Sequence, residues 1–278
     1  MILPKRVVII GGTHGNEWTG IAIIKHYQDL LRNKFPELHI EFIFGNPEAY
    51  QTGKRYKDED LNRASQFLNE NRTTYEAQRA REIREIIQKE SCIVIDLHTT
   101  TSHMGNTLII SQEVPENLSL SALVQNNSPT TKILLAPDPK RKYLVSQSNF
   151  GLMIEIGPIA NNVITSNALE ETLKLLVLTL SQINHFRPTL TEVEVFEEVQ
   201  DVYYPQDHEG NITAYIHSEI SGRDYAPLGK KFKAFMGFNG QEIDGNSDEI
   251  AYPIFINEAA YYPSKLAFTL CRKTIKKI

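Results

Sequence analysis

The feature that most constrains the fold is the alternation of apolar runs with helical patterns over the first two thirds of the chain. Apolar runs typical of strands lie at 6–11, 39–44, 92–97, 107–111, 132–135 and 150–156. Helical patterns lie at 17–32, from the capping-box pattern Thr73-x-x-Glu76 to about Glu90, at 117–126 and at 167–186. This alternation predicts an α/β fold with a mostly parallel sheet covered by helices on both faces.

The pattern changes after Pro188. Residues 192–196 alternate between polar and apolar with period two, and glycine-containing turn signals recur from residue 210 to residue 246. Short strands separated by turns favour a small antiparallel β unit. We therefore expect two domains, an α/β domain over 1–190 and a C-terminal β domain over 191–278.

One long polar segment interrupts the α/β pattern at 46–72. Loops of this length are uncommon inside a compact domain and are usually functional. The segment contains the basic residues Lys54, Arg55 and Arg63. Together with the basic run 140–142, they indicate a site for a small anionic ligand.

A candidate metal site follows the first strand, in the stretch Gly-Gly-Thr-His14-Gly-Asn-Glu17. A second apolar strand ends at His98. The carboxyl ends of strands in an open α/β sheet meet at one edge, where such folds place their sites. A catalytic zinc requires three protein ligands and one open position. The two histidines and Glu17 match this requirement.

Two other interpretations of the first motif remain open. Gly11 and Gly12 before a helix could hold a phosphate, because helix N-termini attract anions, although neither dinucleotide-binding nor P-loop fingerprints are present. A histidine after a strand is also often a hydrogen-bonded turn residue. His98 is the observation that favours a metal site over both.

Composition excludes several classes of protein. The formal net charge of −5 and the lack of a basic stripe argue against a nucleic-acid partner. The chain has 2 cysteines, which excludes a disulfide framework. We find no signal-peptide layout at the N-terminus and no segment long and apolar enough to span a bilayer. We therefore expect a cytoplasmic protein without a membrane partner, and the sequence leaves open whether it forms a homo-oligomer.

Five sequence blocks, in order along nearly the whole chain, resemble the aspartoacylase family. This family belongs to the zinc carboxypeptidase-like hydrolases, which also include the succinylglutamate desuccinylases. The blocks are Gly11–Glu17, Lys54–Arg63, Asp96–Gly105, Ile154–Pro158 and Asn257–Tyr262. The resemblance implies a mostly parallel or mixed sheet flanked by helices, with the C-terminal β domain covering the active-site cleft.

The resemblance also implies a role for each site residue. His14, Glu17 and His98 would bind one zinc ion per chain. Glu155 would be the catalytic base, and Arg55 would polarise the substrate carbonyl. The implied substrate-binding residues are Asn62, Arg63, Tyr143 and Tyr261, of which Asn62 and Arg63 would hold a substrate carboxylate.

These roles agree with the chemistry of the residues. Zinc bound by two imidazoles and one carboxylate keeps a water whose pKa falls to roughly 7. Glu155 lies among Leu152, Met153, Ile154 and Ile156, and an apolar setting raises a carboxyl pKa toward neutrality, as an acid/base catalyst needs. Arg55 could stabilise the developing oxyanion.

One segment departs from the vertebrate aspartoacylases. They carry a further substrate-binding arginine between the position of Tyr143 and the catalytic glutamate, whereas residues 144–150 of this chain contain none. Gln147 is the nearest polar replacement, and Lys140 and Arg141 are the alternatives. The departure puts the preference for aspartate in doubt and leaves the hydrolytic residues unaffected.

The sequence thus predicts a zinc-dependent amidohydrolase that acts on a small-molecule N-acyl amino acid through a water activated by Glu155. N-acetyl-L-aspartate, cleaved to acetate and L-aspartate, is the first candidate substrate. N-succinyl-glutamate and N-acyl aromatic or S-conjugated amino acids are the alternatives. A non-catalytic metal- or anion-binding module is the alternative of a different class, and it would not need Glu155.

Overall fold

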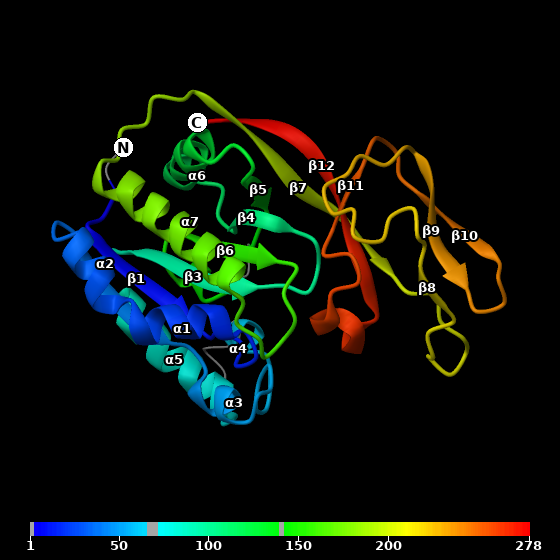
Figure 1. Cartoon of the computed structure of the whole chain (residues 1–278), viewed down its shortest axis with the longest axis horizontal. Coiled ribbons are helices and arrows are strands. Elements are labelled where there is room, and N and C mark those ends of the chain that lie inside the picture. Colours follow the sequence, from blue (N-terminus) through cyan, green and yellow to red (C-terminus); the bar gives the residue numbers. More distant parts are fainter. Residues whose placement is uncertain (1–2, 66–71, 139–141) are drawn as a thin grey trace.

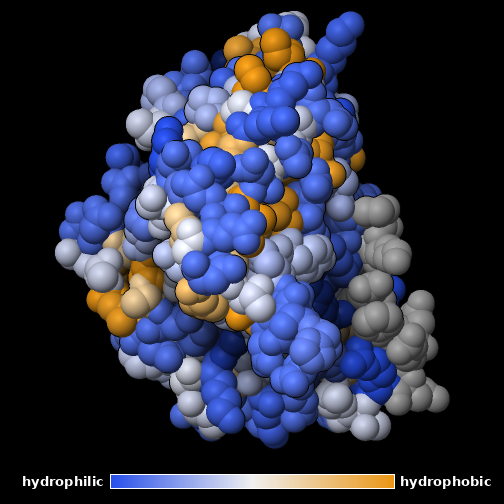
Figure 2. Space-filling model, turned by 90° about the vertical axis from the view of Figure 1, so that its right-hand side faces the viewer, coloured by the Kyte–Doolittle hydropathy of each residue, from blue (hydrophilic) through white to orange (hydrophobic). Residues whose placement is uncertain are grey.

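The computed structural model describes residues 3–65, 72–138 and 142–278. Figure 1 shows helices packed around a central sheet, with a smaller group of strands extending to one side. No helix among these residues is long and apolar enough to cross a membrane. The end of the molecule that faces the viewer in Figure 2 is mostly hydrophilic, with hydrophobic residues in separate patches.

Nine strands of the described residues form one mixed sheet in the order β11-β12-β7-β5-β4-β6-β3-β1-β2. Their bounds are β1 Arg6–Gly11, β2 His39–Phe44, β3 Ile93–Thr99, β4 Gly105–Ile110, β5 Lys132–Leu135, β6 Phe150–Gly157, β7 Glu192–Tyr203, β11 Tyr252–Ile254 and β12 Leu266–Lys277. Strands β2, β1, β3 and β6 run parallel, and β4 pairs antiparallel with β6. The carboxyl ends of β1, β3 and β6 therefore meet at one edge.

Helices cover both faces of the sheet, as the sequence predicts. One face packs against α1 (Trp18–His26), α2 (Gln28–Lys34), α6 (Pro115–Asn127) and α7 (Ser166–Asn184). The other packs against α4 (Leu61–Ala64) and α5 (Tyr75–Gln88). On β1, Val7 and Ile9 face the first layer while Val8 and Ile10 face the second, which is why the whole strand is apolar.

The C-terminal segment contributes to two sheets. Strands β8 (Ala214–Ile216), β9 (Lys231–Gly237) and β10 (Glu242–Asn246) form a separate antiparallel sheet with its own apolar cluster. Strands β7, β11 and β12 instead join the main sheet, where β7 pairs in parallel with β5 through Leu134 and Phe196. One continuous sheet thus connects the two parts of the chain.

Several local features differ from the sequence expectation. The helix predicted over 17–32 is two helices, which meet at the non-helical Tyr27. The long segment 46–72 contains α3 (Pro47–Gln51) and α4. The segment after Pro188 contains a 3-10 helix, η3 (Ala259–Ser264). Another 3-10 helix, η2 (Val145–Gln147), lies just before β6. The predicted capping box was wrong, because α5 is capped by Thr74 and the Glu76 side chain points elsewhere.

Candidate active site

The turn that carries His14 connects β1 to α1 and is shaped by glycines. Gly12 has a φ of +72°, which a residue with a side chain rarely adopts. A Cβ on Gly15 would lie 2.3 Å from the backbone of Ala49, so only glycine lets this turn pack against α3. The Gly15 amide donates a hydrogen bond to the carbonyl of Arg55 at 3.0 Å. The turn and the segment 52–60 are thereby held together.

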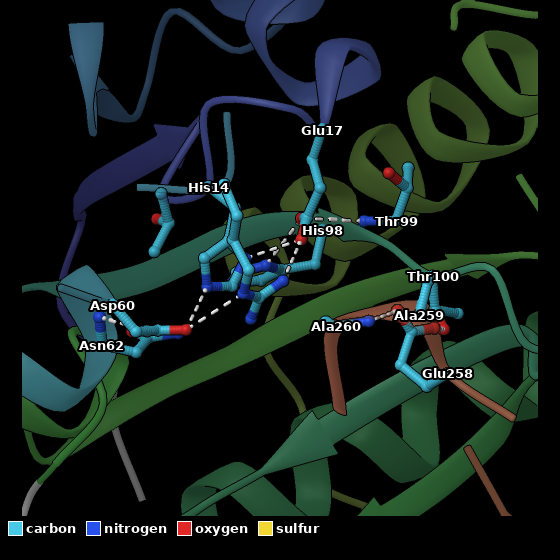
Figure 3. A network of polar contacts seen from close by, with 12 residues as sticks. His14, Glu17, Asp60, Asn62, His98, Thr99, Thr100, Glu258, Ala259 and Ala260 are labelled. Carbon is cyan, nitrogen blue, oxygen red and sulfur yellow. Dashed lines mark hydrogen bonds and ion pairs between the residues drawn. The ribbon is translucent and has the colours of Figure 1, made fainter. Parts of the chain in front are cut away.

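Three buried side chains converge at the carboxyl end of β1 and β3 (Figure 3). His14 Nδ1 lies 2.6 Å from Glu17 Oε1, and His98 Nδ1 lies 2.9 Å from Glu17 Oε2. One potential ligand atom from each residue lies within 4.8 Å of the other two. Both imidazoles therefore direct the same ring nitrogen toward one carboxylate.

Carboxylates outside this cluster lie beside the second ring nitrogen of each imidazole. His98 Nε2 lies 2.9 Å from Asp96 Oδ2, and the Thr13 hydroxyl donates a hydrogen bond to the other Asp96 oxygen. His14 Nε2 lies 3.3 Å from Asp60 Oδ2. Metal-binding histidines commonly direct their second ring nitrogen toward a carboxylate, which fixes the ring and strengthens the ligand.

The charges at the cluster are strongly coupled. Burial alone would raise the pKa of Glu17, but the nearby His14 and His98 outweigh it and hold the pKa of this carboxyl below its ordinary value. Burial alone would lower the pKa of His98, but the carboxylates of Asp96 and Glu17 raise it well above the ordinary value. Two imidazoles and one ionised carboxylate, buried and convergent, fit the donor set of a catalytic zinc site.

Glu155 lies directly beside this cluster, because it is the cross-strand partner of His98 on β6. Its side chain is buried, and its Oε1 has no hydrogen-bond partner among the described residues. Burial raises the pKa of Glu155 well above the ordinary value, and the charges of Glu17 and Glu258 raise it further. A buried carboxyl without a partner is costly, so its presence here indicates a role in binding or chemistry.

Asp60 organises the basic side of the site. Its Oδ1 accepts hydrogen bonds from the backbone amides of Asn62 and Arg63 and so caps the N-terminus of α4. Its Oδ2 lies 3.1 Å from Arg55 Nε. A second nitrogen of Arg55 lies 3.2 Å from Glu17 Oε1, which places this guanidinium beside the three-residue cluster.

Arg63 is exposed on α4, and its guanidinium lies over the ring of Tyr143 at 5.3 Å. The side-chain oxygen of Asn62 accepts a hydrogen bond from the Leu144 amide, which ties α4 to the segment before β6. Tyr261, from η3, packs edge-on against Phe255. Residues from three distant parts of the chain thus meet at one pocket.

All nine site residues predicted from the sequence line a single pocket. They are His14, Glu17, Arg55, Asn62, Arg63, His98, Tyr143, Glu155 and Tyr261. The other residues that line it include Asp60, Glu198, Glu258 and an apolar group of Ile109, Leu134, Ala136, Met153 and Phe255. The pocket thus has a polar end at the cluster and an apolar floor.

Glu258 is a buried site residue to which the sequence analysis assigned no role. Its Oε2 accepts hydrogen bonds from the Thr100 hydroxyl, from the Thr101 amide at 2.8 Å and hydroxyl at 2.9 Å, and from the Ser102 hydroxyl at 3.3 Å. The turn after His98 is therefore held by a residue 160 positions away in the sequence.

Residues 144–150 lack the substrate-binding arginine of the vertebrate aspartoacylases, and the structure describes one of its three possible replacements. Gln147 is buried, donates a hydrogen bond to the Tyr143 carbonyl and is not among the residues that line the pocket. Lys140 and Arg141 lie outside the described residues. The cations that the structure places at the pocket wall are Arg55 and Arg63.

Two family models match the chain. The succinylglutamate desuccinylase/aspartoacylase catalytic domain matches residues 4–183, and the AstE/AspA barrel-sandwich hybrid domain matches residues 191–273. A probable aspartoacylase from Trichodesmium erythraeum is 33% identical over 97% of both chains. An N-acyl-aromatic-L-amino acid amidohydrolase (carboxylate-forming) from Xenopus tropicalis is 36% identical over 97% of this chain and 93% of that one.

Solved structures agree with the sequence comparisons. The crystal structure of murine aminoacylase 3 superimposes with a TM-score of 0.90 at 28% identity, over 98% of this chain and 96% of that chain. Succinylglutamate desuccinylase from Vibrio parahaemolyticus has a TM-score of 0.67 at 14% identity, which shows a shared fold.

Proposed function

The chain belongs to the succinylglutamate desuccinylase/aspartoacylase family of amide-hydrolysing enzymes, and we propose that it is a zinc-dependent deacylase of N-acyl amino acids. The observation that carries the proposal is the buried His14–Glu17–His98 cluster with the unpartnered Glu155 beside it in one pocket. A binding module needs the first three residues but gains nothing from burying the fourth.

We propose that His14, Glu17 and His98 hold one zinc ion per chain. Zinc in such a set acidifies a bound water and polarises a carbonyl oxygen when it is present. Asp96 and Asp60 keep the two imidazoles in the orientation that the ion requires. This assignment is supported by the convergence of both Nδ1 atoms on the Glu17 carboxylate.

Glu155 takes the proton of the attacking water and delivers it to the amide nitrogen, so that the leaving amine departs neutral. Its raised pKa suits both steps, because the carboxyl must accept a proton and then release it. Arg55 stabilises the negative charge that develops on the carbonyl oxygen. Its position is supported by the ion pairs with Glu17 and Asp60.

Arg63 and Asn62 bind the carboxylate of the substrate's amino acid, with Tyr143 and Tyr261 forming the adjacent walls. The planar guanidinium of arginine matches a carboxylate in shape and charge. This places the amino-acid half of the substrate toward α4 and the Tyr143 segment, and the acyl half toward His98.

Two substrate classes are candidates. N-acetyl-L-aspartate is favoured by the two cations at the pocket wall, Arg55 and Arg63. N-acyl aromatic amino acids are favoured by the apolar floor that Ile109, Leu134 and Met153 contribute. Both reactions use the same catalytic residues.

The proposal includes a division of the chain into a catalytic part, 1–190, and a C-terminal part, 191–278, that walls the cleft. It is supported by Tyr261 and Glu258, which reach the pocket from the second part. We propose a cytoplasmic location because of the two free, buried cysteines, Cys92 and Cys271.

Metal analysis and a hydrolysis screen test the proposal together. The screen covers acetyl, formyl and succinyl derivatives of aspartate, glutamate and aromatic amino acids. We expect about one zinc per chain, lost in His98→Ala and Glu17→Ala, and hydrolysis of at least one substrate class. Zinc retention in both variants would place the metal elsewhere, and zinc binding without any turnover would favour the binding module.

A further inference from the structure

The floor of the pocket crosses five adjacent strands of the main sheet. In spatial order they carry His98 on β3, Glu155 and Met153 on β6, Ile109 on β4, Leu134 on β5 and Glu198 on β7. Neighbouring strands lie about 4.8 Å apart, so Glu198 is separated from Glu155 by roughly 14 Å across the strands, and the register sets it further along β7 as well. The pocket therefore extends well beyond the catalytic end.

Glu198 faces this floor because of its register on β7. Phe196, two residues earlier, pairs with Leu134 and belongs to the same apolar cluster as Met153 and Ile109. Side chains two residues apart on a strand lie on the same face of the sheet. Glu198 is an exposed residue, so its carboxyl marks the open end of the floor, the end farthest from His98.

The charged groups nearest to Glu198 are one carboxylate, Asp201, and two cations. Lys142 and Arg63 are the cations close enough to affect it, and both lie over the ring of Tyr143, at 5.1 and 5.3 Å. If Arg63 holds the α-carboxylate of the substrate, Lys142 is the remaining cation against the carboxylates of Glu198 and Asp201. A further carboxylate at this end would then meet an apolar floor and a like charge, both of which oppose its binding.

The lengths of the substrate side chains also favour a long neutral side chain over an acidic one. With bonds of about 1.5 Å, an aspartyl side chain ends roughly 5 Å from the scissile carbon and a tyrosyl side chain roughly 10 Å from it. The longer side chain covers the floor formed by Met153, Ile109 and Leu134, and its hydroxyl reaches toward the Glu198 carboxylate. The acidic side chain ends above apolar atoms.

We propose that Glu198 is a specificity-determining residue, which excludes acidic amino-acid side chains from the far end of the pocket and favours long neutral side chains, above all those with a hydrogen-bond donor at the tip. The inference rests on the proposed deacylase function and selects between its two substrate classes. Glu198 takes no part in the cleavage of the amide bond.

The test compares two substrates in three proteins. The kcat/KM values for N-acetyl-L-glutamate and N-acetyl-L-tyrosine are measured in the parent, in Glu198→Gln and in Glu194→Gln. Glu194→Gln removes the same charge from the same strand, at a surface position paired with Lys273. The assay is run at pH 8, where the exposed Glu198 carboxylate is charged.

We expect Glu198→Gln to raise the glutamate-to-tyrosine ratio of kcat/KM roughly five-fold, the upper range for a solvent-screened charge contact. Glu194→Gln should leave the ratio at the parent value. Added salt should raise the ratio in the parent and not in Glu198→Gln, because salt screens only a charge that is present. A purely structural role for Glu198 would not produce this salt dependence.

A ratio that stays within about two-fold of the parent in Glu198→Gln, or that falls, overturns the inference. If the parent hydrolyses no N-acyl amino acid, the proposed function fails separately. Titration calorimetry of the same two compounds with the same three proteins then tests the role of Glu198 in specificity. N-acetyl-L-glutamate must bind more tightly, relative to N-acetyl-L-tyrosine, in Glu198→Gln than in the parent for the inference to stand.

Discussion

His98 and Glu155 occupy paired positions on β3 and β6, yet only His98 has carboxylate partners. Asp96 and Glu17 lie within 2.9 Å of the His98 ring nitrogens, whereas Glu155 Oε1 has no hydrogen-bond partner among the described residues. The two buried carboxyls beside His98 differ more clearly, because the histidines lower the pKa of Glu17 whereas burial raises that of Glu155. The proposed function uses this difference, with Glu17 as a metal ligand and Glu155 as the acid/base catalyst.

Glu155→Gln tests this separation. The amide is almost the same size as the carboxyl but cannot accept a proton, so kcat should fall by about 10²–10⁴. Zinc content and the thermal melting temperature should stay at parent values, because Glu155 is not a ligand. Turnover close to that of the parent would remove Glu155 from the mechanism.

The two arginines of the pocket should differ in their kinetic effect. Arg63→Ala should mainly raise KM, because a substrate carboxylate is bound in both the ground state and the transition state. Arg55→Ala should mainly lower kcat, by about 10²-fold or more, because its contact strengthens as the oxyanion forms. Steady-state kinetics on one N-acyl amino acid check this, and the reverse pattern would mean that the roles are exchanged.

Among the elements, α5 supports the site through one residue. The Glu76 carboxyl is fully buried and accepts hydrogen bonds from the backbone amides of Lys57 at 2.6 Å, Asp58 at 3.0 Å and Glu59 at 3.3 Å. It also accepts one from the Asn46 side chain. The segment between Arg55 and Asp60 is therefore held in place by a helix on one face of the sheet.

Glu76→Ala should cost about 2–3 kcal/mol of unfolding free energy, because several buried amides lose a charged acceptor. It should also lower kcat by loosening the segment that carries Arg55. Urea unfolding and steady-state kinetics measure the two effects. Glu82→Gln, at an exposed position of the same helix, is the control and should change neither. Equal unfolding free energies for Glu76→Ala and the parent would contradict this role.

Local signals in the sequence predicted most strands of the sheet and the ligand set His14, Glu17 and His98, whereas substrate-binding residues such as Tyr143 and Tyr261 came from the family resemblance. His14 and His98 each end an apolar strand, and Glu155 lies inside one. The roles of Glu76 and Glu258 were not predictable, because an acidic residue in a helix or before a turn does not reveal a partner far along the chain. The helix break at Tyr27 was also not predictable, because no glycine or proline lies at this position in the sequence.

At the scale of the whole molecule, the pairing of β7 with β5 joins the C-terminal strands to the catalytic sheet. The period-two alternation of residues 192–196 predicted a strand but not its neighbour, since alternation carries no information on pairing. The Glu258 hydrogen bonds form a second connection, at the turn after His98. With these two connections, Tyr261 and Phe255 wall one side of the pocket.

A walled pocket should exclude long chains. We expect hydrolysis of N-acetylated single amino acids and no hydrolysis of an N-acetylated pentapeptide with the same first residue. The second and later residues of the peptide would collide with the side of the pocket that Tyr261 and Phe255 form. Mass spectrometry of both reactions after equal incubation gives the comparison. Efficient cleavage of the pentapeptide would show an open cleft.

The distance along the chain between the cluster and its wall has a consequence for biosynthesis. His14, Glu17, His98 and Glu155 all leave the ribosome well before Phe255, Glu258 and Tyr261, and chains fold from the N-terminal side as they emerge. For the time needed to translate the intervening hundred residues, the nascent protein presents the His14–Glu17–His98 cluster without its cover. If the cluster binds zinc as proposed, the ion can then reach its ligands directly from solvent during synthesis.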